Sequence, residues 1–153
     1  MPIITFLSDF GTTDHYVASV KASLLSVDTS ISIVDISHDI SKSNVAHGAF
    51  VLNAVFRDFP EGSIHLAAVN TVDATTEGFL AAKIENHYFI APNNGLLSLI
   101  TRETPLEIVS LNTGHKETAS NEEYPSFTFP AKTVLAPAAA QLFKGASLES
   151  LGD

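Results

Sequence analysis

Polar residues follow three mainly apolar, strand-like segments of the chain, and their types could bind a ligand. In the first case, residues 3–8 lead directly to Asp9 and a glycine turn. A carboxylate fixed at a strand end can accept hydrogen bonds from two vicinal hydroxyls, such as those of a ribose. Asp9 could instead bond to the backbone of its own loop, as aspartate often does in turns. Asp9 is the strongest single candidate for a ligand contact.

The other two polar segments are residues 37–43 and 70–78. They must meet residues 8–14 in space if the three are to form a site. Parallel strands of an open α/β sheet bring their carboxyl ends to the same edge, and ligands bind at that edge. If the preceding strands are parallel, we expect the three polar segments to lie together.

The histidines do not show the spacing of a metal site. None of the six forms an HxH, HxxH or HExxH pattern and the chain has no cysteine, so we predict no metal. His65 alternates within a strand-like segment, which predicts a structural role. His38 stands beside Asp39 and could act as a general base. The sequence contains no nucleophile elbow, Walker loop or dinucleotide-binding motif, so no catalytic residue is assigned.

The elements that must position these residues alternate between strand and helix signals, which predicts an α/β fold. Apolar residues at helical spacing predict a first helix capped by Asp14 and a second helix between Asn44 and Phe59. The remaining elements are expected as strands at 31–36, 63–69 and 106–111, a hairpin at 79–91 that turns at 85–87, a short helix at 96–101 and a closing helix at 133–145. Residues 112–125 show no periodicity. Residues 147–153 resemble the start of a linker, with a frayed C-terminus as the alternative.

The composition excludes several classes of function. Seventeen acidic and eight basic residues give a net charge of −9, and without a basic cluster such a chain repels nucleic-acid phosphates. No apolar stretch approaches the roughly 20 residues that span a membrane, and the N-terminus lacks the pattern of a signal peptide. We expect a cytoplasmic domain that binds a small molecule and has neither nucleic acid nor membrane as a partner.

Five segments, in order along the chain, carry a resemblance to a known family. They contain the sequences SDFGTTD (8–14), IVDISHDI (33–40), FPEGSIH (59–65), YFIAPNNGLL (88–97) and APAAA (136–140). Through these segments the chain resembles the S-adenosylmethionine hydroxide adenosyltransferases and their relatives, the fluorinases and chlorinases.

The resemblance implies a three-layer α/β/α sandwich around a mostly parallel mixed sheet, with residues 1–153 as a single N-terminal domain. It also implies that the family's smaller, β-rich C-terminal domain is absent from this chain. Family members form trimers that hold S-adenosylmethionine between the N-terminal domain of one subunit and the C-terminal domain of a neighbour. We therefore expect a homotrimer with a nucleoside ligand, S-adenosylmethionine as the substrate and no separate cofactor.

The resemblance also assigns substrate-binding residues. The counterpart of Asp9 in the family holds the ribose hydroxyls, which favours the ligand interpretation of this residue. Asn70, Thr128 and Phe129 are predicted to lie at the same substrate pocket. Ala131 stands where fluorinases place a serine that grips the halide, and because alanine cannot donate that bond, halogenation is disfavoured.

The chain departs from the family at the residues thought to activate water. Hydrolytic members carry an Asp-Arg-His set, and the matching positions here are Asn70, Gly78 (or Glu77) and Pro130. Asn70 cannot carry a charge or take a proton, and Pro130 has no side-chain proton chemistry. Losing a positioned base typically costs about 10²–10⁴ in rate. Asp73 or His38 could substitute, on their proximity in the sequence alone.

Three hypotheses of function follow. The first is a domain that converts S-adenosylmethionine and water to adenosine and methionine, with Asp9 orienting the sugar. The second is a non-catalytic module that binds S-adenosylmethionine or a nucleoside, which explains the missing Asp-Arg-His set best. The third is a structural α/β interaction domain.

Overall fold

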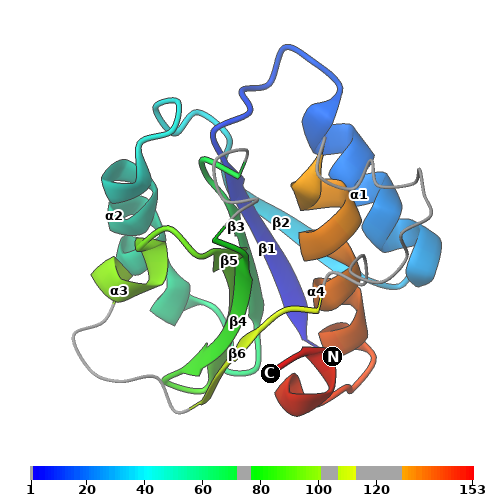
Figure 1. Ribbon diagram of the computed structural model, residues 1–153. Helices are drawn as coiled ribbons and strands as arrows, with labels where there is room; N and C mark the ends of the chain where they lie inside the picture. Colours follow the sequence, from blue (N-terminus) through cyan, green and yellow to red (C-terminus); the bar gives the residue numbers. More distant parts are fainter. Residues whose placement is uncertain (1, 72–76, 101–106, 113–128) are drawn as a thin grey trace.

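A six-stranded mixed sheet forms the middle of the molecule, and helices cover both of its faces (Figure 1). The computed structural model describes residues 2–71, 77–100, 107–112 and 129–153. The strands are β1 (Ile3–Ser8), β2 (Ser32–Ser37), β3 (Ile64–Ala68), β4 (Phe79–Ile84), β5 (His87–Pro92) and β6 (Glu107–Ser110), in the order β2-β1-β3-β5-β4-β6. The first four in that order are parallel, and β4 is antiparallel to both β5 and β6. The predicted α/β fold with a mostly parallel sheet is confirmed.

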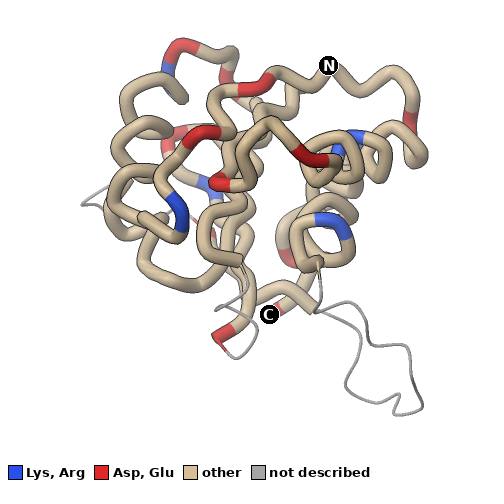
Figure 2. The backbone as a smooth tube through the Cα atoms, turned by 90° about the horizontal axis from the view of Figure 1, so that it is seen from above, with Lys and Arg blue, Asp and Glu red and all other residues tan. Residues whose placement is uncertain are grey.

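The helices form the two outer layers. α1 (Tyr16–Val27) and α4 (Ala136–Phe143), which continues from the π-helical segment η4 (Ala131–Leu135), cover one face of the sheet. α2 (Val45–Val55) and α3 (Leu96–Ile100) cover the other face (Figure 1). The view from above in Figure 2 also shows helices on both sides of the strands. The 3-10 helices η1 (Phe56–Asp58) and η5 (Leu148–Leu151) complete the described elements.

Each face of the sheet packs a separate apolar core. Successive residues of a strand point to opposite faces, so in β1 Phe6 joins the core beneath α1 and α4, while Leu7 joins the core beneath α2. Both side chains are wholly buried. A parallel strand covered on both faces must be apolar almost throughout, which is why the first strand is so clear in the sequence.

Several predicted boundaries change in the structure. The cap of α1 is His15, without a side-chain hydrogen bond, so the prediction that Asp14 caps this helix was wrong. The helix begins one residue later than predicted, which leaves Asp14 outside the cap position. Asn44 does cap α2, because its side-chain oxygen accepts the N–H of His47 at 3.0 Å. α2 itself ends at Val55 and continues as η1.

The later elements also differ in detail. His87 begins β5 rather than lying in the hairpin turn, which consists of Glu85 and Asn86, both with positive φ. The closing helix begins at Ala131 instead of residue 133. The prediction of a linker at 147–153 was wrong, because η5 buries Leu148 and Leu151 and Gly152 forms an antiparallel bridge with Leu111.

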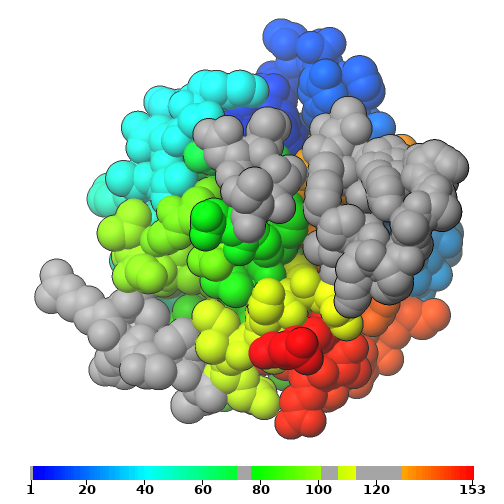
Figure 3. Space-filling model, in the orientation of Figure 1, coloured from blue at the N-terminus to red at the C-terminus, as the bar shows by residue number. Residues whose placement is uncertain are grey.

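The connections of the parallel strands create an opening at one edge of the sheet. The loop after β1 leads to α1 on one face, whereas the loop after β2 leads to α2 on the other. Loops that diverge in this way leave a crevice at the carboxyl ends of the strands, where ligands bind in open α/β sheets. In Figure 3 the segments that follow β1 (blue) and β2 (cyan) lie side by side at this edge.

Candidate functional site

The carboxylate of Asp9 joins the three polar segments. Asp9 directly follows β1 and is 8% exposed. Its Oδ2 accepts the backbone N–H of Ser43, in the loop before α2, at 2.7 Å. The same oxygen accepts the backbone N–H of Asn70, which follows β3, at 3.1 Å. The expectation that parallel strands bring residues 8–14, 37–43 and 70–78 together is confirmed for the parts of these segments that the structure describes.

The two amides that reach Asp9 come from residues with unusual backbones. Ser43 and Asn70 have φ values of 58° and 59°, in the left-handed region. Residues other than glycine rarely adopt this conformation, and such positions cluster at functional sites. Asp9 thus bonds to two other loops, and no hydrogen bond to its own loop, or to its Oδ1, occurs among the described residues. A carboxylate oxygen without a hydrogen-bond donor among the described residues can accept a hydrogen bond from a ligand.

A cavity of about 300 Å³ opens at this edge of the sheet. Asp9 is not on its wall, but Asp9 and the two residues that its carboxylate bonds each have a chain neighbour there. The lining residues are Phe10, Asp14, Tyr16, Lys42, Thr71, Phe129 and Pro130. Phe10 follows Asp9, Lys42 precedes Ser43 and Thr71 follows Asn70. The volume is at the lower end of the range for small-molecule sites.

Three aromatic rings form the apolar part of the wall. Tyr16 and Phe129 lie 5.4 Å apart between ring centroids, and Phe10 lies 6.0 Å from Tyr16 and 5.7 Å from Phe129. Asp14 and Lys42 add one charge of each sign. Apolar rings with a few polar groups are the usual lining of a small-molecule site, and aromatic faces can stack on a nucleobase.

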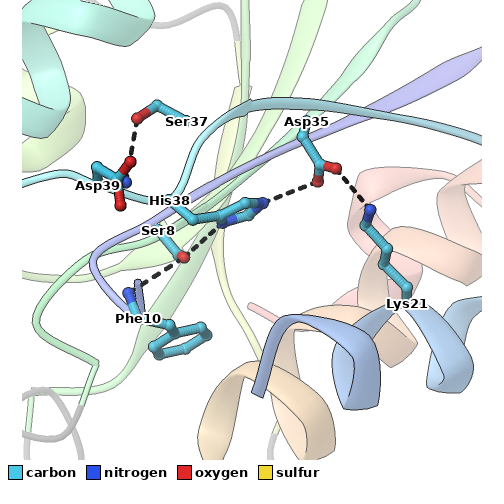
Figure 4. Close-up of polar contacts among 7 residues, drawn as sticks. All are labelled: Ser8, Phe10, Lys21, Asp35, Ser37, His38 and Asp39. Atoms are coloured by element: carbon cyan, nitrogen blue, oxygen red, sulfur yellow. Dashed lines mark hydrogen bonds and ion pairs between the residues drawn. The ribbon is translucent and has the colours of Figure 1, made fainter. Parts of the chain in front are cut away.

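Beneath the Asp9 turn, four side chains form a hydrogen-bonded chain (Figure 4). Ser8 Oγ lies 2.6 Å from His38 Nδ1, and His38 Nε2 lies 2.8 Å from Asp35 Oδ1. Lys21 Nζ donates to the other carboxylate oxygen of Asp35 at 2.5 Å. Burial opposes ionisation of Asp35, but hydrogen bonds from His38 and Lys21 outweigh it and hold the pKa of this carboxyl below its ordinary value.

The partner of His38 is therefore Asp35 and not Asp39. Asp39 is exposed, and its backbone N–H donates to Ser37 Oγ at 3.1 Å. Both ring nitrogens of His38 are already bonded within a buried environment, which leaves neither free for a general base at the cavity. The residue types match a nucleophilic Ser-His-Asp set, but Ser8 is wholly buried and cannot meet a substrate.

The other predicted site residues fall in different places. Phe129 lies on the cavity wall, and Asn70 reaches Asp9 through its backbone. Thr128 and Asp73 lie outside the described residues. The role of Thr128 at the substrate, like the roles of Asp9, Asn70 and Phe129, stays a prediction. The suggestion that Asp73 replaces a missing water-activating residue also stays a prediction.

The positions that the resemblance aligns with a water-activating set lie in different surroundings. Pro130 lies on the cavity wall with Phe129, and the next residue, Ala131, is fully buried. Gly78 accepts the backbone N–H of Asn93 at 2.9 Å, at the turn after β5. The exposed Glu77 accepts the side-chain amide of Asn93 at 3.2 Å through its carbonyl oxygen. These contacts involve backbone groups and place no new proton donor or acceptor at the cavity.

Sequence reasoning missed Ser43, Asp35 and the role of Ser8. Ser43 acts through its backbone, which no side-chain motif reveals. Asp35 lies three residues before His38, and in a regular strand two side chains at this spacing point to opposite faces of the sheet. The pairing of β1 with β2 shifts between Phe6 and Leu7, so that they face Asp35 and Ser37 respectively. This bulge brings Asp35 and His38 to the same side.

Two features are absent from residues 2–71, 77–100, 107–112 and 129–153. Within these ranges no helix is long and apolar enough to cross a membrane. The same ranges contain no group of three or more His, Cys, Asp or Glu side chains that could hold a metal ion.

Comparison with known proteins identifies the family. The model of the SAM (S-adenosylmethionine) hydroxide adenosyltransferase N-terminal domain matches residues 4–152. The chain belongs to the SAM hydroxide adenosyltransferase family. An (R)-S-adenosyl-L-methionine hydrolase of Methanocaldococcus jannaschii is 30% identical over 149 residues, covering 93% of this chain and 53% of the relative. A fluorinase of Nocardia brasiliensis is 32% identical, covering 99% of this chain and 57% of the relative.

Solved structures of the same kind agree with this family membership. A crystal structure of an uncharacterized conserved protein from Thermotoga maritima matches with a TM-score of 0.88 at 33% identity, covering 99% of this chain and 57% of that one. A conserved hypothetical protein from Thermus thermophilus matches with a TM-score of 0.77 at 31% identity, covering 99% and 60%. The chain therefore spans little more than half the length of these relatives.

Proposed function

We propose that this member of the SAM hydroxide adenosyltransferase family binds S-adenosylmethionine with its ribose at Asp9 and supports hydrolysis to adenosine and methionine. The observation that carries the proposal is the Asp9 carboxylate, held at the sheet edge by two loop amides beside an aromatic-lined cavity. The family and the curated hydrolases among its members supply the substrate.

The geometry suits a ribose for a simple reason. A vicinal diol offers two hydroxyl donors, and an ionised carboxylate is an acceptor only. The bonds from Ser43 and Asn70 fix Oδ2 in place, so the carboxylate does not lose further freedom when a ligand binds. Each hydrogen bond to a charged group contributes about 1.5–3 kcal/mol. Asp9 alone can therefore account for a substantial share of nucleoside affinity.

The proposed reaction is a direct displacement at the ribose C5′ atom. A water oxygen forms a bond to C5′ while the C5′–S bond breaks. The electron pair of the C5′–S bond moves to the sulfonium sulfur, which becomes the neutral thioether of methionine. The water proton passes to solvent. Because a neutral leaving group needs no acid, catalysis consists mainly of holding water and C5′ in line. Orientation of the sugar by Asp9 would provide that alignment.

A non-catalytic binding module is the second candidate, and the cavity wall favours it. Pro130 stands on the wall and offers no group for proton transfer. Asn70 contributes its backbone N–H to Asp9, and its amide side chain cannot act as a base. At these two positions the protein would contact the nucleoside without activating a water.

The two candidates are separated by incubating the complete protein with S-adenosylmethionine and measuring adenosine and methionine by chromatography. We expect equimolar release, reduced at least tenfold in Asp9→Asn, which keeps the size of the side chain. Binding by calorimetry without release would establish the binding module instead. The absence of both binding and release would contradict the proposal. The homotrimer and the cytoplasmic location belong to the same proposal, and light scattering of the complete protein tests the first.

A further inference from the structure

The hydrogen-bonded chain beneath Asp9 has a defined direction. The carboxylate of Asp35 can only accept, so His38 Nε2 carries the proton in the bond of 2.8 Å. In the neutral ring, Nδ1 is then an acceptor and the hydroxyl of Ser8 donates to it at 2.6 Å. The Ser8 oxygen then accepts the backbone N–H of Phe10 at 3.3 Å. With a neutral His38 ring, one arrangement of protons satisfies every one of these groups.

His38 holds the Asp9 turn on both sides. Its ring bonds Ser8, the residue before Asp9, and its carbonyl oxygen accepts the backbone N–H of Gly11 at 2.7 Å. Gly11 has a φ of 78°, so a residue that tolerates the left-handed region is required where the turn closes. The Asp9-Phe10 peptide lies between these two attachment points. Its position therefore depends on where His38 is held.

The remaining contacts fix His38 itself. Phe6 packs against the ring with centroids 4.7 Å apart at 71°, and the bulge in β2 brings Asp35 under Nε2. Asp35 is in turn bonded by Lys21 from α1. The outer end of the chain is half-exposed, with side-chain exposures of 31% for Lys21 and 39% for Asp35, whereas Ser8 and His38 are buried.

We propose that His38 is a positioning residue for ligand binding, which sets the place of the Asp9 carboxylate through Ser8 and Gly11 and is itself oriented by Asp35. The inference rests on the proposed role of Asp9 at the ribose. A group held within about 0.5 Å by a packed and hydrogen-bonded support binds better than the same group on a free loop. Loss of a hydrogen bond between Ser8, His38 and Asp35 should therefore weaken specifically the recognition of the ribose hydroxyls.

The test compares adenosine with 2′,3′-dideoxyadenosine, which lacks both hydroxyls, by calorimetry on the complete protein. We expect the unmodified protein to prefer adenosine at least tenfold. Ser8→Ala removes only the hydroxyl and should reduce the preference at least threefold. A purely structural role would lower thermal stability in Ser8→Ala but would leave the preference for adenosine unchanged.

A matched pair of variants at Asp35, at the more exposed end of the hydrogen-bonded series, keeps the test informative if Ser8→Ala fails to fold. Asp35→Ala removes the acceptor for Nε2, while Asp35→Asn retains an oxygen that can accept the same bond. We expect a reduced preference in Asp35→Ala and a preserved one in Asp35→Asn. If the unmodified protein prefers adenosine and Asp35→Ala shows the same preference, the positioning role of His38 is contradicted, while the role of Asp9 at the ribose still stands. No preference in the unmodified protein would instead overturn the role of Asp9, and with it both proposals.

Discussion

At the scale of single residues, Asp9 combines a buried charge with neutral partners. Its described hydrogen bonds come from two backbone amides, and no cation pairs with it among the described residues. Burying a carboxylate is unfavourable unless hydrogen bonds replace its lost water, and here Oδ2 receives two of them. The same two bonds hold the loops after β2 and β3 next to the turn after β1. One side chain thus assembles the edge that we assign to the ligand.

A second buried polar cluster lies away from this edge. Thr5 Oγ1 lies 2.7 Å from His65 Nδ1, and His65 Nε2 lies 3.0 Å from His87 Nδ1. Phe56 and Phe89 surround the two imidazoles. The prediction of a structural role for His65 is confirmed by these contacts.

The His65 cluster predicts a loss of stability in acid. Burial and the neighbouring His87 lower the pKa of His65 from 6.5 to about 3. Burial also lowers the pKa of His87. The nearby Glu61 and Glu85 raise that pKa, and Arg57 lowers it further. Between pH 6.5 and 3 the unfolded chain binds more protons than the folded one, so stability falls as pH falls through this window. The slope from one such group is at most about 1.4 kcal/mol per pH unit.

We expect urea unfolding of His65→Gln to show a flatter dependence on pH than the unmodified protein between pH 7 and 5. The amide can still bond to Thr5 or His87 but does not titrate. Parallel stability curves for the two proteins would contradict the assignment of this acid sensitivity to His65.

At the scale of elements, the close approach of α2 to the end of β3 positions one of the site loops. Gly48 lies on the buried face of α2, where an added Cβ would come within 2.9 Å of Val69 Cγ2. Val69 directly precedes Asn70, whose N–H donates to Asp9. The absence of a side chain at Gly48 therefore lets the helix and the strand end meet at the required distance.

Gly48→Ala should lower the free energy of unfolding. Overpacking in a buried site costs about 1–3 kcal/mol, which exceeds the gain of up to about 1 kcal/mol from placing alanine in a helix. Urea unfolding measures the difference. In a Val69→Ala background the contact is removed, so there Gly48→Ala should stabilise. A stabilising effect in both backgrounds would show that the close contact has no energetic consequence.

The elements also show which parts of the structure can be predicted from the sequence. β1 and the β4–β5 hairpin were predicted within about a residue, because buried strands and turn residues leave strong local signals. Asp14 failed as a cap because the choice between adjacent caps depends on where α1 packs. The bulge in β2 left no local signal, and with it the contact between Asp35 and His38 was missed. The sequence predicted that the three polar segments meet at one edge of the sheet, but not that they bond to Asp9. Backbone donors such as the N–H of Ser43 leave no signal in the side chains.

At the scale of the whole molecule, the described residues show no cluster of basic side chains at the opening of the sheet, where Lys42 lies on the cavity wall together with the acidic Asp14. The described Lys and Arg residues are scattered over the backbone in Figure 2, and the net charge of the chain is −9. A ligand rich in phosphate would be repelled by this overall charge, whereas the sulfonium of S-adenosylmethionine is cationic and would be attracted. Charge, fold and family therefore agree on the class of ligand that we propose.

The most direct test of the ribose site at Asp9 is calorimetric titration of the complete protein and its Asp9→Asn variant with S-adenosylmethionine. The variant keeps the shape of the side chain but loses its charge, so we expect its affinity to fall at least tenfold, since hydrogen bonds to a charged group contribute about 1.5–3 kcal/mol. Thermal unfolding of both proteins shows whether the variant is folded. Equal affinities in two folded proteins would contradict the assignment of the ribose to Asp9.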